Sequence, residues 1–134
     1  MTQQTIFTEK APAAIGPYSQ AVATEHLLFT SGQIGIHPLT GQLRPGIVEQ
    51  THQVLENLAA VLDAAGSSMG QIVKTTIFLT DMAEFPTVNE IYAQAFQDEP
   101  PARSTVQVAA LPLGALIEIE AIALRASGAS AGEQ

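Results

Sequence analysis

Arg103 is the side chain best placed to bind an anion. It is one of only five cationic residues, and Pro100 and Pro101 fix the backbone just before it. The apolar segment 105–109 that follows has the composition of a strand. An arginine held at the entrance of a strand in an acidic chain can bind a carboxylate or a phosphate through two parallel hydrogen bonds. From this segment alone, a structural salt bridge is the preferred interpretation.

Glu118 is the second candidate. In the segment 116–124, the strand period of two places Glu118 and Glu120 on one face together with leucine and isoleucine side chains. For either glutamate by itself, a partly solvated face is the simpler interpretation. A carboxylate on an apolar strand is also how a pocket presents a general base, which could position water or move protons beside an arginine. Hairpin pairing of the two strands would bring Arg103 and Glu118 to neighbouring positions.

Other kinds of chemistry have little support. The chain has no cysteine, which excludes disulfides, thiolate metal sites and cysteine catalysis. Its histidines, His26, His37 and His52, lie in different predicted elements without metal-ligand spacing, so we expect no metal site. Nucleophile-elbow, dinucleotide-binding and P-loop motifs are also absent from the sequence.

Charge and composition restrict the partners. With 13 acidic and 5 basic residues, the net charge of −8 repels phosphate backbones, and the cations are scattered, so we expect no nucleic-acid partner. The apolar runs are too short to cross a membrane, and no secretory signal is visible, so we expect a cytoplasmic protein without a membrane partner. Because 46% of the residues are hydrophobic and only 13% are charged, we expect other subunits to cover some apolar surface.

The elements that must position these residues follow from periodicity. We predict one domain over residues 1–125 and a flexible C-terminal tail over 126–134, which is rich in Ser, Ala and Gly. Helices are predicted at 47–65 and 84–97, and strands at 4–8, 19–24, 27–31, 72–80, 104–110 and 116–125. The order β-β-β-α-β-α-β-β predicts an α+β fold, with both helices on one face of a mixed sheet.

Seven short segments between residues 11 and 125 form a further pattern. They are 13–21 (AAIGPYSQA), 30–34 (TSGQI), 50–58 (QTHQVLENL), 73–79 (VKTTIFL), 88–92 (VNEIY), 101–106 (PARSTV) and 117–123 (IEIEAIA). Each segment alone is a weak signal, but together they are highly specific. On these segments the chain resembles the RidA/YjgF family of reactive-intermediate deaminases over nearly its whole length.

The resemblance implies a chorismate-mutase-like α+β fold and a homotrimer with a pocket at each subunit interface. It also implies hydrolysis of 2-imino acids, derived from enamines such as 2-aminoacrylate and 2-aminocrotonate, to 2-keto acids and ammonia without a cofactor. By the resemblance, Arg103 pairs with the substrate carboxylate and Glu118 positions or activates the attacking water. The other residues that it assigns to the pocket are Tyr18, Ser31, Gly32, Asn89 and Thr105.

Two features keep alternatives open. Many deaminase members have a cysteine where this chain has Thr105. A pocket contact through the backbone or a small side chain is compatible with threonine, whereas regulation through a thiol is not. The second hypothesis is a non-catalytic trimer that binds small acids or protects client proteins as a holdase. The family has also been linked to ribonuclease and translation-inhibitor activity, against which the net charge of −8 and the scattered cations argue.

Overall fold

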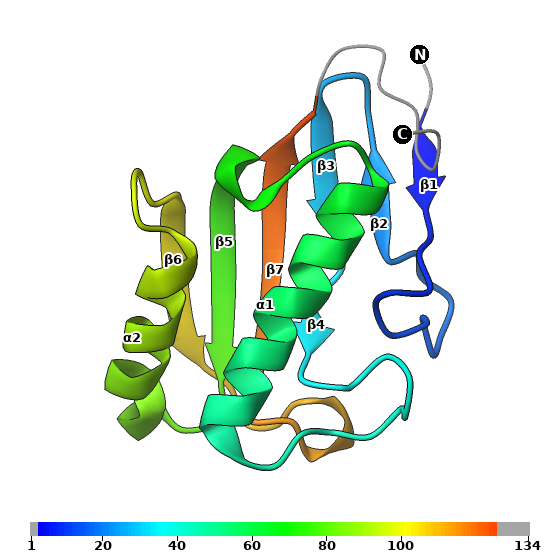
Figure 1. The fold of residues 1–134 in the computed structure, drawn as a ribbon. Coiled ribbons are helices and arrows are strands. Elements are labelled where there is room, and N and C mark those ends of the chain that lie inside the picture. Colours follow the sequence, from blue (N-terminus) through cyan, green and yellow to red (C-terminus); the bar gives the residue numbers. More distant parts are fainter. Residues whose placement is uncertain (1–2, 126–134) are drawn as a thin grey trace.

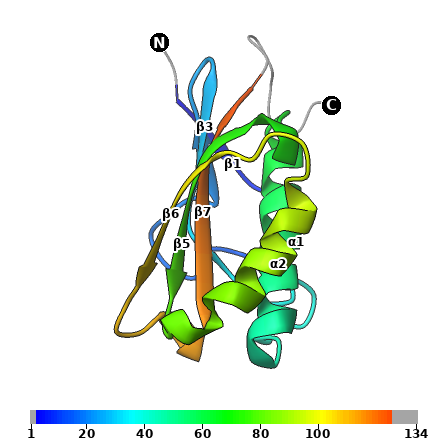
Figure 2. The same ribbon diagram turned by 90° about the vertical axis from the view of Figure 1, so that its left-hand side faces the viewer.

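A mixed seven-stranded sheet covered on one face by two helices makes up the computed structural model (Figure 1). The structure describes residues 3–125, so the predicted tail at 126–134 lies outside the described residues. Figure 2 shows the sheet edge-on, with both helices on the same side. The helices are α1 (Gly46–Ala64) and α2 (Phe85–Ala95); the strands are β1 (Gln4–Ile6), β2 (Ala21–Ala23), β3 (Leu27–Thr30), β4 (Gln33–Ile34), β5 (Ile72–Leu79), β6 (Ala102–Gln107) and β7 (Ile117–Leu124). The predicted α+β class and the placement of both helices on one face are confirmed.

The strand order is β1-β2-β3-β7-β5-β6, and β4 also pairs with β7. Strands β5 and β6 run parallel, because α2 carries the chain from one to the other as a crossover connection. A single 3-10 turn at Pro112–Gly114 follows β6, and β7 then enters between β3 and β5. The expected hairpin between the strands of Arg103 and Glu118 is therefore wrong, since β5 separates β6 from β7.

The alternation predicted for the last strand is confirmed. The residues of β7 that face the helices, namely Ile117, Ile119, Ala121 and Ala123, are all buried. The other four, namely Glu118, Glu120, Ile122 and Leu124, lie on the face without helices and are half-buried or exposed. Strand β7 thus contributes an unbroken apolar row to the core and a mixed row to the open face of the sheet.

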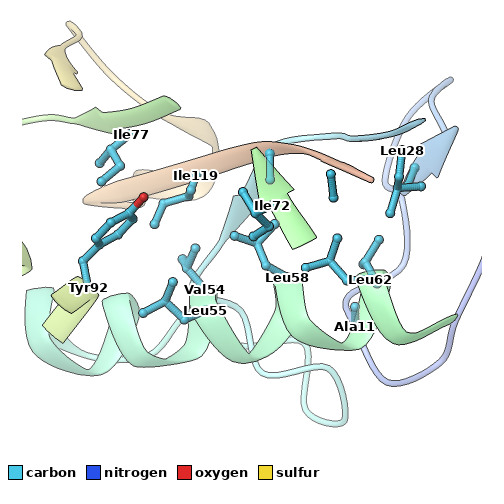
Figure 3. Close-up of a cluster of buried hydrophobic side chains, with 14 of the residues drawn as sticks. Ala11, Leu28, Val54, Leu55, Leu58, Leu62, Ile72, Ile77, Tyr92 and Ile119 are labelled. Atoms are coloured by element: carbon cyan, nitrogen blue, oxygen red, sulfur yellow. The ribbon is translucent and has the colours of Figure 1, made fainter. Parts of the chain in front are cut away.

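The core lies between the sheet and α1. Val54, Leu58 and Leu62 on one stripe of α1 are fully buried, and Figure 3 shows them pointing at the sheet, towards residues such as Ile119. Burying each such side chain contributes about 1.5–3 kcal/mol. The helix ends where the sequence predicts, because Gly66 adopts a left-handed φ of 76° and the Ser67 amide donates to the Leu62 carbonyl at 2.9 Å.

Two further findings concern the elements. Strand β4 was not predicted, because two residues are too few to show a period. Within the described residues, no helix is both long enough and apolar enough to span a bilayer.

Candidate active site

Arg103 lies on the edge strand β6, and its half-buried side chain points to the helix-covered face of the sheet. Its Nη1 donates a hydrogen bond of 2.8 Å to Oδ1 of Asn89 on α2. The guanidinium carbon also lies 5.0 Å from the ring centroid of Tyr92 and 5.3 Å from that of Phe85. We call Phe85, Asn89 and Tyr92 the arginine cage. They are spaced i, i+4 and i+7 along α2, so they share one face of the helix.

The arginine cage is uncharged. The ion pairs within residues 3–125 join Glu25 to His26 and Arg44 to Glu49, and neither includes Arg103. Within residues 3–125, Arg103 therefore forms no structural salt bridge. A half-buried guanidinium whose neighbours are neutral can pair with an anionic ligand.

Thr105 lies two residues beyond Arg103 on the same face of β6. Its Oγ1 is buried and has no hydrogen-bond partner among the described residues. Most buried hydroxyls have a hydrogen-bond partner, so the unpaired Oγ1 of Thr105 is an unusual feature of this part of the strand. Arg103, Asn89 and Thr105 together form what we call the anchor half-site.

Glu118 belongs to a different location. It lines a cavity of about 70 Å³ together with Tyr18 and Gly32, segments of the loop 12–20 and Pro112. A Cβ atom at position 32 would overlap the Glu118 carboxylate, so only glycine lets this side chain lie where it does. Burial raises the pKa of the Glu118 carboxyl above its ordinary value, and the nearby charge of Glu120 raises it further. Tyr18, Gly32 and Glu118 form what we call the water half-site.

Two further residues support the water half-site: Gln20, which also lines the cavity, and Ser31, which is not among its lining residues. The Ser31 hydroxyl, assigned to the pocket by the resemblance, donates a 2.6 Å hydrogen bond to the Ser19 carbonyl. Gln20, to which we assigned no role from the sequence, is 3% exposed and holds the loop at both ends of its amide. Its Oε1 accepts from the Thr8 amide at 2.7 Å, and its Nε2 donates to the Pro12 carbonyl at 2.8 Å. The only sequence signal for Gln20 is a polar residue next to an apolar strand.

The two half-sites lie on opposite faces of one sheet. Phe78 of β5 pairs with Glu118 on one side and with Val106 on the other, so these three side chains share the open face. Arg103 lies three positions from Val106, and an odd number of steps along a strand reverses the face. Within one chain, Arg103 and Glu118 therefore do not meet.

The open face of the sheet is apolar at several places. Phe29, Val106 and Leu124 are each 41–46% exposed in the isolated chain. The helices cover only the opposite face (Figure 2). No group of three or more potential metal ligands occurs within residues 3–125.

Comparison with known proteins relates this geometry to a family. A family model described as Endoribonuclease L-PSP matches residues 8–125. The chain is 54% identical over 124 residues to the mouse protein named 2-iminobutanoate/2-iminopropanoate deaminase, with 92% of each chain covered. Among solved structures, it is similar to RidA from an Antarctic Psychrobacter species, at 47% identity with a TM-score of 0.89, covering 90% of this chain and 98% of that one. Escherichia coli TdcF with bound serine is 48% identical with a TM-score of 0.89, and 92% and 99% of the two chains are covered.

Proposed function

The chain belongs to the YjgF/RidA family, whose model is described as Endoribonuclease L-PSP, and we propose that it is a 2-iminobutanoate/2-iminopropanoate deaminase. In this reaction, water adds to the C=N bond of a 2-imino acid and ammonia leaves, which yields the 2-keto acid. The imino acids arise from enamines such as 2-aminoacrylate and 2-aminocrotonate. Relatives of that name cover nearly the whole chain at about half identity, which supports the reaction class.

The observation that carries the proposal is the uncompensated cation of the anchor half-site. A 2-imino acid has a carboxylate next to its reacting carbon, and a guanidinium can bind it through two parallel hydrogen bonds. Arg103 has neutral neighbours and one hydrogen-bond partner, Asn89, among the described residues, so its remaining donors can face the substrate. The unpaired hydroxyl of Thr105 adds a further polar contact.

The water half-site supplies the rest of the chemistry. An imine carbon is already electrophilic, so an anchored substrate and one oriented water are enough, and the reaction needs no cofactor. The Glu118 carboxylate accepts a hydrogen bond from this water and directs its oxygen at the imine carbon. Its raised pKa makes it a better proton acceptor than an ordinary glutamate.

Because Arg103 and Glu118 lie on opposite faces of one sheet, the proposal requires a second copy of the chain. We place the site at the interface of a homotrimer, where one subunit provides Arg103, Asn89 and Thr105 and its neighbour provides Tyr18, Ser31, Gly32 and Glu118. The apolar side chains on the open sheet face support this arrangement, since such a face is normally covered. A cytoplasmic location remains a prediction that cell fractionation would test.

A coupled assay with imino acids generated from serine and threonine tests the function. We expect Arg103→Ala and Glu118→Ala each to lower kcat/KM by about 100-fold, because a charged hydrogen-bonding partner of the reacting molecule is worth about 1.5–3 kcal/mol. Arg44→Ala is the matched control, since Arg44 is a half-buried arginine paired with Glu49 outside both half-sites. Full activity of Arg103→Ala would contradict the proposal.

The same assay separates the alternatives. A non-catalytic acid-binding or holdase-like trimer would show no acceleration over spontaneous hydrolysis of the imine. The remaining alternative is a ribonuclease or translation inhibitor, and the description of the family model names the first of these. The net charge of −8 makes binding to a phosphate backbone unfavourable, so we expect nuclease activity to separate from the protein on purification.

A further inference from the structure

Tyr92 is placed more rigidly than a residue that only fills the core would need to be. It is 5% exposed and extends from α2 toward the sheet, as Figure 3 shows. Its hydroxyl forms a 2.7 Å hydrogen bond with Oγ1 of Thr75, and its ring lies 4.6 Å from that of Phe96. The face of this fixed ring lies against the Arg103 guanidinium at 5.0 Å. Thr75 of β5 also pairs with Arg103 of β6. The strand register thus places Thr75 next to Arg103, and the hydroxyl contact holds Tyr92 next to Thr75.

The arginine cage stabilises the half-buried guanidinium of Arg103 without a counterion. A half-buried cation loses part of its hydration and needs compensation. A carboxylate would provide it, but would also neutralise the charge that must attract the substrate. Aromatic faces attract a guanidinium without changing its net charge. Burial raises the pKa of the Tyr92 phenol, so this ring stays neutral as well.

We propose that Tyr92 is a positioning residue for the anchor: its ring, fixed by Thr75 and assisted by Phe85, sets where the Arg103 guanidinium meets the substrate carboxylate. The proposal rests on the proposed function for the identity of the substrate. Tyr92 touches the guanidinium rather than the substrate, so it acts through Arg103. The cage takes the place that a counterion would occupy beside a half-buried arginine.

Three variants test the role. Tyr92→Leu removes the aromatic face, and we expect it to raise KM for the imino acid by about tenfold while kcat changes by less than about twofold, because an anchor stabilises ground state and transition state alike. Tyr92→Phe keeps the ring and loses only the bond to Thr75, so it should keep KM within about threefold of the wild-type value. Val88→Ala removes a fully buried side chain from the same helix, and it should lower Tm without raising KM.

A binding measurement tests the same role without turnover. Calorimetry with 2-oxobutanoate and with the uncharged 2-oxobutanamide gives the preference of the protein for a carboxylate. We expect Tyr92→Leu to lower this preference by about tenfold and Tyr92→Phe to preserve it. If Tyr92→Leu does not fold, Phe85→Leu removes the other ring at a half-buried position and should lower the preference in the same direction.

The outcomes distinguish the two proposals. If the wild type binds 2-oxobutanoate in preference to the amide but does not accelerate imine hydrolysis, the proposed function fails. The positioning role is then still tested by the carboxylate preference of the Tyr92 and Phe85 variants. The positioning role is overturned if Tyr92→Leu and Phe85→Leu weaken both ligands equally or leave the preference unchanged. It is also overturned if the wild type itself shows no preference for the carboxylate.

Discussion

Glu118 has a pKa that its surroundings raise, and this fixes the expected pH dependence. Burial disfavours its charged form, and the charge of Glu120 adds to the effect. The ionised carboxylate is the form that accepts a hydrogen bond from water. We therefore expect kcat/KM to fall as the pH decreases through the raised pKa, at a pH above the ordinary value of 4.5.

Substitution of Glu120 tests whether Glu118 causes this fall of kcat/KM at low pH, which we call the acid limb of the pH profile. Glu120→Gln removes the neighbouring charge, so the limb should move to lower pH while the activity at neutral pH is retained. Glu25→Gln makes the same change of charge at a site where the side chain is 72% exposed, and it should leave the limb in place. A limb that does not move in Glu120→Gln would show that Glu118 does not set the profile.

Arg103 illustrates how a residue type acquires a role from its neighbours. The sequence shows an arginine after two prolines, which suits a structural ion pair as well as a ligand site. The structure surrounds it with two rings and an amide, and no carboxylate of residues 3–125 pairs with it. These neutral neighbours, which no local pattern encodes, are compatible with the proposed anionic ligand.

At the scale of elements, the two-residue connection between β3 and β4, both of which pair with β7, sets the position of Glu118. Gly32 in this connection leaves the space that the carboxylate occupies. Gly32→Ala should displace Glu118 and lower kcat/KM by about 100-fold, because displacing a reacting group by about 1 Å can cost that much. The activity assay together with a thermal melt measures this, and we expect Tm to change little because the affected side chain is a half-buried one.

Gly70 provides the matched control for this prediction. An added Cβ at Gly70 meets nothing nearer than 4.0 Å, and its backbone does not require glycine. Gly70→Ala should therefore keep both activity and Tm. Wild-type activity in Gly32→Ala would mean that Glu118 can work from another position.

At the scale of the whole molecule, the opposite placement of the half-sites predicts complementation between inactive subunits. Arg103→Ala and Glu118→Ala chains should each keep only about one hundredth of the activity, but in the proposed trimer a mixed assembly would contain one interface with an intact Arg103 and an intact Glu118. After random mixing in equal amounts, we expect about one quarter of the wild-type activity. A site within one chain would regain nothing on mixing.

Native mass spectrometry supplies the control for this experiment. Equal mixing after unfolding and refolding should give trimers that contain both kinds of chain, and mixing without subunit exchange should give neither mixed trimers nor activity. A monomeric mass would contradict the trimer itself.

Much of the fold follows from local patterns. The period of α1, the alternation of β7 and the glycine after α1 are properties of neighbouring residues, so the sequence predicts the two helices, the long strands and the buried row of β7. Strand β4 cannot be predicted in this way, because its stability depends on pairing with β7 rather than on its own two residues.

The sequence by itself determined which residues can do chemistry, namely a cation at the start of one strand and a carboxylate on the last one. Only the tertiary structure decided that they lie on opposite faces of the sheet, on strands separated by β5. It also decided that Arg103 meets two aromatic rings instead of a carboxylate. The physical reason is that period and turn chemistry act between residues close in sequence, whereas strand order depends on which distant edges pair to bury the core.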